Sequence, residues 1–194
     1  HGMYWSSSND FTEAMYYRLA QAVSFSNSFI KNASELSGEE VNVFIAEARF
    51  LRAYAYYNLL DLYGNVPLTT EISTELPTQS NRTELFNFIE SELMEIESTL
   101  LASNEYGRVD NIAAHALLSR LYLNAEAWTG QDRYADCVTY SQNVINSGYS
   151  LNMNDANGNG TAYDELFMAD NDINGAQNEF IFTLNFDGMQ SQTY

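Results

Sequence analysis

The sequence predicts a mainly α-helical fold of antiparallel helical hairpins in an α/α superhelix, with a small C-terminal extended or β segment. Apolar residues recur every three or four positions over most of residues 1–148, and polar or glycine-containing turns separate these stretches. A shift of the chain by 68 residues also aligns Arg52 with Arg120 and Tyr54 with Tyr122. This shift is twice the tetratricopeptide period of about 34 residues, so it favours repeated hairpins, although it carries little weight by itself.

Composition indicates one globular domain and excludes several classes of protein. The 194 residues are 45% apolar, which is enough to form a hydrophobic core. The net charge of −18 would repel nucleic-acid phosphates, so we expect no DNA or RNA binding. The single cysteine, Cys137, excludes a disulfide scaffold and a cysteine zinc site, and its helical setting predicts a core position. No apolar run approaches the ~18 residues of a membrane-spanning helix.

The first predicted helix spans Asp10 to Lys31, with Asn9 or Asp10 as its N-cap. Its apolar positions follow the helical period and predict one face packed on a neighbouring helix. They are Phe11, Met15, Leu19, Ala22, Phe25 or Ser26, and Phe29. A polar turn after this helix predicts a hairpin with the next one.

The second helix lies within residues 41–68 and is the centre of the predicted fold. Its apolar residues again fall three or four apart, and Gly64 and Pro67 end it. Several tyrosines on its other faces predict contacts with neighbours on more than one side. Arg49 and Arg52 lie one turn apart in this helix, and we expect both to pair with acidic groups between packed helices.

Capping residues and terminating glycines predict three further helices. Asn81 and Glu84 match a capping box that opens the third helix, whose glutamates predict a solvated outer face. Asp110 is the expected cap of a fourth helix, which runs to Ala127 and would form a second hairpin with the third. A fifth is predicted over residues 134–147, ended by Gly148.

The sequence changes character after Gly148, and we treat residues 149–194 as a second, loop-rich region. A segment rich in Asn and Gly precedes a short predicted helix over residues 163–168. Alternating apolar residues from Glu179 to Phe186 predict a half-buried strand, which needs a partner strand.

The segment Asp170 to Gly175 matches the first half of a calcium-binding loop. Alternate Asp and Asn residues before a glycine can supply several of the oxygens that calcium needs. Ile181 stands at the twelfth position in place of Glu, so Glu179 or Gln177 would have to substitute. A solvated turn without metal is the competing interpretation. The predicted calcium ligands are Asp170, Asp172, Asn174 and Glu179.

Catalysis is not expected, because no nucleophile-elbow, Walker or dinucleotide-binding motif is present. His1 and His115 share no metal-binding spacing. The 14 tyrosines and two tryptophans instead offer aromatic platforms of the kind on which sugar rings pack. Trp128, at a predicted helix end, is one such candidate, although a half-buried cap on the hairpin is the simpler interpretation.

Four segments resemble the SusD/RagB family of surface glycan-binding lipoproteins. They are EARFLRAYAYYNLLDLYGNVPL, GRVDNIAAHALLSRLYLNAEAWTG, YADCVTYSQNVINSGYSL and ELFMADND. The resemblance covers most of the chain from about Glu39 onward and is strongest to the starch-binding members. It implies tetratricopeptide-type hairpins over residues 1–148 and an incomplete glycan-binding part over 149–194. It also implies an internal piece of a longer protein, lacking its lipid anchor and its C-terminal part.

The same resemblance implies a function. We expect non-enzymatic capture of a starch-like oligosaccharide or polysaccharide at the surface of the outer membrane, with delivery to a SusC-like TonB-dependent transporter. Laying DGMQSQTY on the equivalent family segment implies that Tyr194 stacks on a glucose ring, and relatives hold calcium near the segment matching Asp170. The alternative is a helical-repeat scaffold that binds a protein or peptide and no sugar.

Overall fold

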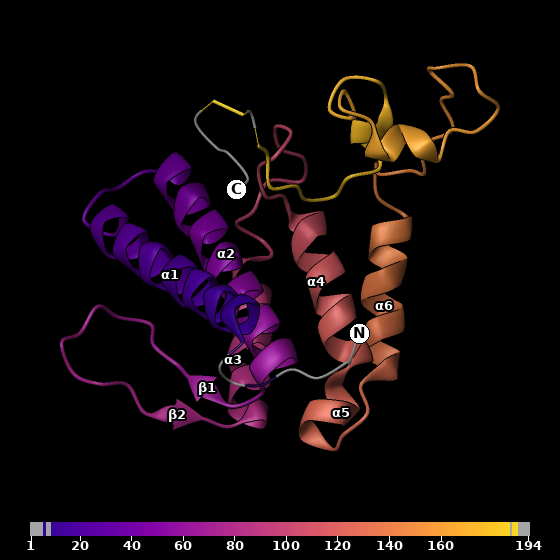
Figure 1. Cartoon of the computed structure of the whole chain (residues 1–194). Helices are drawn as coiled ribbons and strands as arrows, with labels where there is room; N and C mark the ends of the chain where they lie inside the picture. The colour runs from indigo at the N-terminus through magenta and orange to yellow at the C-terminus, as the bar shows by residue number, and fades with distance from the viewer. Residues whose placement is uncertain (1–5, 7–8, 187, 190–194) are drawn as a thin grey trace.

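The computed structural model describes residue 6, residues 9–186 and residues 188–189, and the predicted mainly helical hairpin fold is confirmed (Figure 1). Its elements in chain order are α1 (Asp10–Ala33), α2 (Glu39–Tyr63), β1 (Val66–Pro67), β2 (Gln79–Ser80), α3 (Arg82–Ile96), α4 (Asn111–Leu123), α5 (Ala125–Thr129), α6 (Tyr134–Ile145), η1 (Asp164–Phe167) and η2 (Ala176–Asn178). The α-helices form the body, and the loops after α6 lie at one end of it.

The helix α1 begins as predicted but turns a different face toward α2. The Asn9 side chain accepts hydrogen bonds from the backbone N–H groups of residues 11 and 12, as a cap should. The predicted apolar stripe is largely exposed, however, with Phe11 at 80% and Phe25 at 66%. Val23, Ser26 and Asn27 are buried, and of these only Ser26 was among the predicted positions. The predicted Leu19 and Ala22 are partly buried against the core. Smaller residues on this face let α1 approach α2 closely, and the Phe side chains are left outside.

The helix α2 is the centre of the core, because α1 and α3 both pack along it. Gly64 ends it with a positive φ of 75°, as predicted. The buried surface is wider than one stripe and includes Phe50, Tyr56 and Leu60. Leu62, one of the regularly spaced apolar residues from which a single buried face was predicted, is 56% exposed, so that prediction was wrong at this position.

The helix α3 opens with the predicted capping box, in which Asn81 and Glu84 bond reciprocally. The prediction of a solvated glutamate face was wrong for Glu92, which is 6% exposed. Two arginines of α2 turn toward it, and their charges compensate its burial.

The helices α4 and α6 pack along each other, whereas α3 contacts α2 more than α4. The Asp110 side chain caps α4 by accepting the N–H of Ala113. The predicted continuous helix to Ala127 is interrupted at Asn124, whose φ of −99° and ψ of 2° leave the α region. The short helix α5 follows and redirects the chain toward α6.

The predicted strand over residues 179–186 is wrong. In the described residues the sheet consists of β1 paired antiparallel with β2, and residues 179–186 pair with neither. The apolar residues of this segment pack on helices instead, since the Phe182 ring lies 5.3 Å from that of Phe50 and 5.8 Å from that of Tyr54. The short helix predicted nearby is present as the 3-10 helix η1. The division of the chain near residue 148 stays a prediction.

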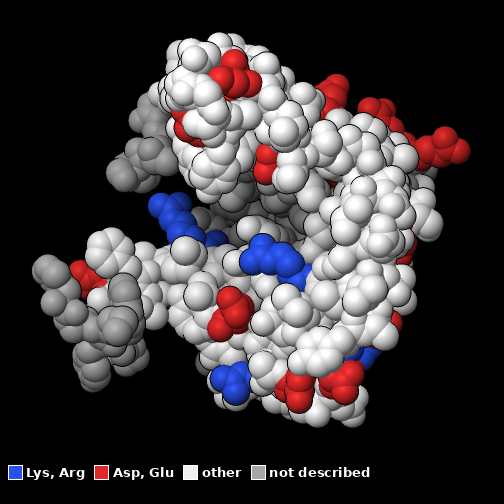
Figure 2. Space-filling model, turned by 90° about the vertical axis from the view of Figure 1, so that its right-hand side faces the viewer, with Lys and Arg blue, Asp and Glu red and all other residues white. Residues whose placement is uncertain are grey.

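The protein is strongly acidic overall, but its charged side chains are unevenly distributed over the surface. On the face shown in Figure 2, several basic side chains lie beside a central hollow. No helix in the described part of the chain is long and apolar enough to cross a membrane.

Candidate functional site

The paired arginines of α2 form a buried network that joins α1, α2 and α3. Arg52 Nη2 lies 2.5 Å from Glu92 Oε2, and Arg49 Nη2 lies 2.7 Å from Glu92 Oε1. Arg49 also pairs with Glu95 at 2.6 Å, and Arg52 Nη1 donates to Asn27 Oδ1 at 2.8 Å. The prediction that both arginines pair with acidic groups is therefore confirmed. Because the network fills its own hydrogen-bonding capacity inside the core, its role is structural.

A cleft of about 290 Å³ lies where the loop after α3 meets the segment before residue 184, and it is the candidate site. It combines aromatic rings with amide and hydroxyl side chains. Its ring-bearing lining residues are Tyr106, Tyr149, Phe180 and Phe182, and its polar ones include Asn104, Arg108, Asp110, Gln177, Asn178 and Thr183.

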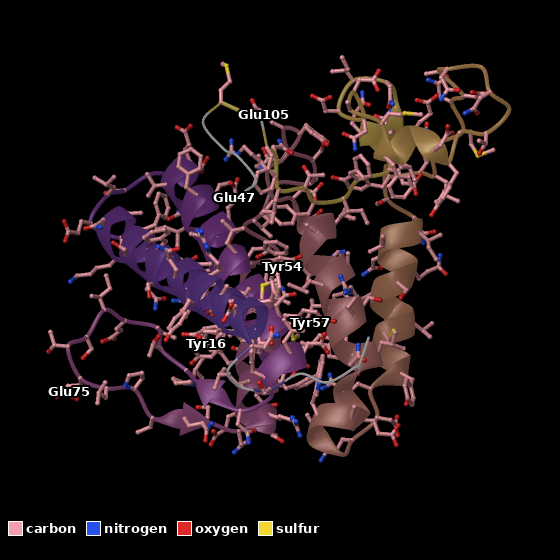
Figure 3. The ribbon with its side chains drawn as sticks, in the orientation of Figure 1. Tyr16, Glu47, Tyr54, Tyr57, Glu75 and Glu105 are labelled. Carbon is pink, nitrogen blue, oxygen red and sulfur yellow. The ribbon has the colours of Figure 1, made fainter. Side chains whose placement is uncertain are left out.

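Glu47 of α2 holds one wall of the cleft in place. Its Oε1 accepts from Asn104 Nδ2 at 2.9 Å and from Arg108 Nη2 at 2.6 Å. The Arg108 guanidinium also lies 5.1 Å from the centre of the Phe44 ring. Glu47 lies on α2 beneath the loop that carries Glu105 (Figure 3). The central helix therefore positions a loop that has no regular structure of its own.

Gly107 lets the two walls approach each other. Its φ is +83°, and a Cβ built on it would lie 2.3 Å from Asn185 Nδ2. A side chain at this position would be strained and would also push the amide of Asn185 away. The sequence therefore uses glycine where the loop meets the C-terminal segment.

Asp110 joins the floor of the cleft to α4. It is 1% exposed and accepts hydrogen bonds from the Ala113 N–H at 2.9 Å and from the Tyr149 hydroxyl at 2.8 Å. Burial raises the pKa of the Tyr149 phenol, and the bond to Asp110 adds to the rise. Tyr149 therefore stays protonated at neutral pH and donates to Asp110.

A second hollow of about 610 Å³ continues from the cleft, because Tyr106, Phe180 and Thr183 line both. Tyr106 is 41% exposed and Phe186, on the far side, is 59% exposed. A pyranose packs its C–H face on such a ring, and neighbouring amides and hydroxyls can bond its hydroxyl groups. The arrangement suits a neutral sugar chain.

The predicted calcium segment forms a turn beside this region. The Asn174 side chain donates to Glu165 Oε2 at 3.0 Å and lies 3.4 Å from Asp170 Oδ1. The Glu179 carboxylate accepts the N–H of Asn152 at 2.7 Å. Asp170 and Asn174 are thus brought together, and Glu165 joins them, although the sequence motif did not include it.

Among the described residues no three His, Cys, Asp or Glu side chains are grouped as a metal site. Calcium at this turn would therefore need amide and backbone oxygens to complete its shell, which its preference for hard oxygen ligands allows. Calcium binding by Asp170, Asp172, Asn174 and Glu179 stays a prediction.

The remaining residues considered in the sequence analysis do not line the cleft in the described structure. Tyr194 lies outside the described residues. Trp128 is half-buried, with its ring 5.8 Å from that of Tyr57, as expected of a cap on the hairpin. His115 is buried and its Nε2 lies 2.7 Å from Glu97 Oε1. The sequence analysis did not single out Tyr106. The one local signal was its neighbour Gly107, a glycine in a polar loop between two predicted helices.

Comparisons with known proteins agree on one family. Residues 3–123 match the SusD-like family described as starch-binding and associating with the outer membrane. The chain is similar to the starch-binding protein SusD of Bacteroides thetaiotaomicron, with 39% identity over 98% of this chain and 34% of that protein.

Two solved structures extend the comparison. A SusD-like protein from Bacteroides fragilis superposes with a TM-score of 0.76 at 25% identity, covering 95% of this chain and 36% of that one. A laminarin-binding SusD-like protein gives a TM-score of 0.70 at 25% identity, covering 84% of this chain and 36% of that one. The chain spans about a third of the length of these relatives.

Proposed function

Because the chain belongs to the SusD-like family, as its motifs predicted, we propose that it is part of a protein that captures starch-like glycan without catalysis. The observation that carries this proposal is the cleft between residues 102–110 and 177–183. Its half-exposed rings and its amide side chains are the groups that recognise a neutral sugar chain.

Location and delivery belong to the same proposal. The family description associates its members with the outer membrane, which supports a place at the cell surface. Lipid anchoring there, and transfer of the captured glycan to a SusC-like TonB-dependent transporter, are what the family resemblance implies. Two of the relatives compared above, the starch-binding protein SusD and the laminarin-binding SusD-like protein, are named for binding carbohydrate, and this supports a binding role for the present chain.

Calcium has a supporting role in this proposal. A cation held by the turn at Asp170 would fix the segment that leads to Glu179 and onward to Phe180. The ion would order one wall of the cleft and take no part in any reaction.

A titration of the isotopically labelled chain with maltoheptaose, followed by NMR, tests the proposal. Because the chain contributes one part of a larger family fold, we expect weak binding, with a Kd of about 1 mM or above. The largest shift changes are expected at residues 104–108 and 177–183, with none along α6. Absence of changes at the cleft at saturating sugar would contradict the proposal.

A specific observation favours the alternative of a peptide-binding scaffold. An apolar groove of about 480 Å³ lies between α1 and α2 and is lined by Phe25, Phe29, Phe44 and Leu51. Such grooves accept the apolar face of a helix. In the same titration, shift changes confined to this groove on addition of an amphipathic helical peptide, with none from sugar, would favour the scaffold.

A further inference from the structure

The loops that follow α6 lie at one end of the helical body and contain three pairs of asparagine and glycine (Figure 1). The pairs are Asn157-Gly158, Asn159-Gly160 and Asn174-Gly175. An asparagine that precedes a glycine is chemically labile, because glycine has no Cβ to hinder attack of its backbone nitrogen on the preceding side chain. The structure distinguishes the three pairs, although the sequence does not.

The three asparagine side chains make the same local hydrogen bond. Each side-chain oxygen accepts the backbone N–H two residues further along the chain, at 3.0 Å for Asn157, 3.0 Å for Asn159 and 2.9 Å for Asn174. This Asx turn places a donor on the oxygen that gains negative charge when the side-chain carbon is attacked. The three side chains are therefore activated in the same way.

The three glycine N–H groups differ in their partners. The Gly160 N–H donates to Asp155 Oδ2 at 2.8 Å, and the Gly175 N–H donates to Gln177 Oε1 at 2.7 Å. Within the described part of the chain, no group accepts the N–H of Gly158. Its nitrogen can therefore turn toward the preceding side chain, whereas each of the other two must first break a hydrogen bond.

We propose that Asn157 is a site of spontaneous deamidation and that Asn159 and Asn174 convert more slowly. The Gly158 nitrogen loses its proton to solvent base and attacks Asn157 Cγ. The Cγ–Nδ2 bond then breaks, and Nδ2 takes a proton from water and leaves as ammonia. Water opens the resulting succinimide at either carbonyl and gives aspartate or isoaspartate. No atom is oxidised or reduced, and water is the co-reactant.

The conversion adds a carboxylate to a part of the loop that is already acidic. The Asn157 side chain donates to Asp164 Oδ2 at 3.2 Å, and this donor is lost. The hydrogen bond from Asn159 lowers the pKa of Asp164, so this carboxyl group is ionised at neutral pH. The Asn157 N–H also donates to Glu165 Oε1 at 2.8 Å. Because like charges repel, the modified loop should be held less firmly against η1.

The test is peptide mapping by mass spectrometry of the folded chain, stored in mildly alkaline buffer. Conversion at Asn157 should be about tenfold faster than at Asn159, the factor that corresponds to about 1.4 kcal/mol for releasing an N–H from a carboxylate. The chain unfolded in urea is the first control. There the contacts of the glycine nitrogens are gone, so the three asparagines should convert at similar rates.

A variant tests the proposed protection directly. Asp155→Ala removes the acceptor of the Gly160 N–H, so conversion at Asn159 should rise about tenfold toward the rate at Asn157. Asp132→Ala removes an exposed carboxylate from another loop and is the matched control, which should leave the rate at Asn159 unchanged.

Three results would overturn the proposal. They are equal rates at the three asparagines in the folded chain, the same order of rates in the unfolded chain, and an unchanged rate at Asn159 in Asp155→Ala. None of these measurements involves sugar, so the glycan proposal stands or fails separately in the maltoheptaose titration.

Discussion

Glu92 is the residue on which the buried network depends, since its two oxygens accept from different arginines. Arg52 is 5% exposed and has little access to water that could replace the carboxylate. The network therefore holds α2 against α3 and also sets the start of the loop between β1 and β2 at Thr69. Removing one charge would leave the others buried and only partly paired.

We therefore predict that Glu92→Gln lowers the free energy of unfolding by about 3 kcal/mol, the usual cost of breaking a buried ion pair. Glu95→Gln is the control, because Glu95 is an exposed partner of Arg49 and such pairs contribute about 1 kcal/mol or less. Urea denaturation followed by circular dichroism measures both. Equal decreases of the free energy of unfolding in the two variants would contradict the prediction that the buried Glu92 contributes more than the exposed Glu95.

Gly107 gives a second prediction at this scale. Gly107→Ala places a side chain at a φ of +83° and against Asn185, so we expect a loss of about 1–3 kcal/mol in stability and a changed cleft. Gly148→Ala is the control, because no atom lies within 4 Å of a Cβ there and its φ is not in the left-handed region. An equal decrease of the Tm in the two variants, measured by thermal denaturation, would contradict this account of Gly107.

At the scale of elements, local signals located most helix starts. Asn9, the box of Asn81 with Glu84, and Asp110 are all observed as caps, because capping needs few residues close in sequence. The face that each helix buries was harder to predict. Sequence periodicity does not determine which neighbour a helix meets, and α1 buries Val23 and Asn27, which were not predicted, while Phe11 and Phe25 are exposed.

The predicted strand was wrong for the same reason, because the sequence pattern does not show which neighbour a segment packs on. Alternation over residues 179–186 resembled a strand, but its Phe182 side chain packs on Phe50 and Tyr54 of α2. The cleft was missed for a related reason. Residues 104–108 and 177–183 are some seventy positions apart in the chain, and only tertiary packing brings them together.

The turn at Asp170 carries the prediction about metal. Calcium at millimolar concentration should raise the Tm, since a ligand that binds only the folded state stabilises it by about 2.7 kcal/mol at 100 times its Kd. The double variant Asp170→Ala, Asp172→Ala should lose this rise, because the motif then lacks its carboxylates. Magnesium, which demands a tighter octahedral shell, is the control ion. A Tm of the unmodified chain that calcium does not change would contradict the prediction.

At the scale of the whole molecule, the chain supplies a helical body from which the loop between β1 and β2 projects (Figure 1). It also has a cleft lined by residues 102–110 and 177–183. The chain spans about a third of its relatives' length. One aromatic contact contributes about 1 kcal/mol, whereas even millimolar affinity needs about 4 kcal/mol.

Tyr194 gives a prediction at this scale, because the family resemblance implies that its ring stacks on glucose. A longer protein that contains this chain should bind maltooligosaccharides more tightly than the chain does. Tyr194→Ala should weaken that binding about fivefold, the factor that corresponds to one lost aromatic contact of about 1 kcal/mol. Calorimetry measures both, and tight binding by the 194-residue chain itself would place the site elsewhere.

The most direct test of the central claim compares Tyr106→Ala with Tyr134→Ala in the maltoheptaose titration. The two tyrosines are similarly exposed, at 41% and 47%, but Tyr106 lines the cleft and Tyr134 begins α6. If the cleft binds sugar, Tyr106→Ala should weaken binding about fivefold while Tyr134→Ala leaves the Kd unchanged. An unchanged Kd in Tyr106→Ala would contradict the claim that this cleft receives the glycan.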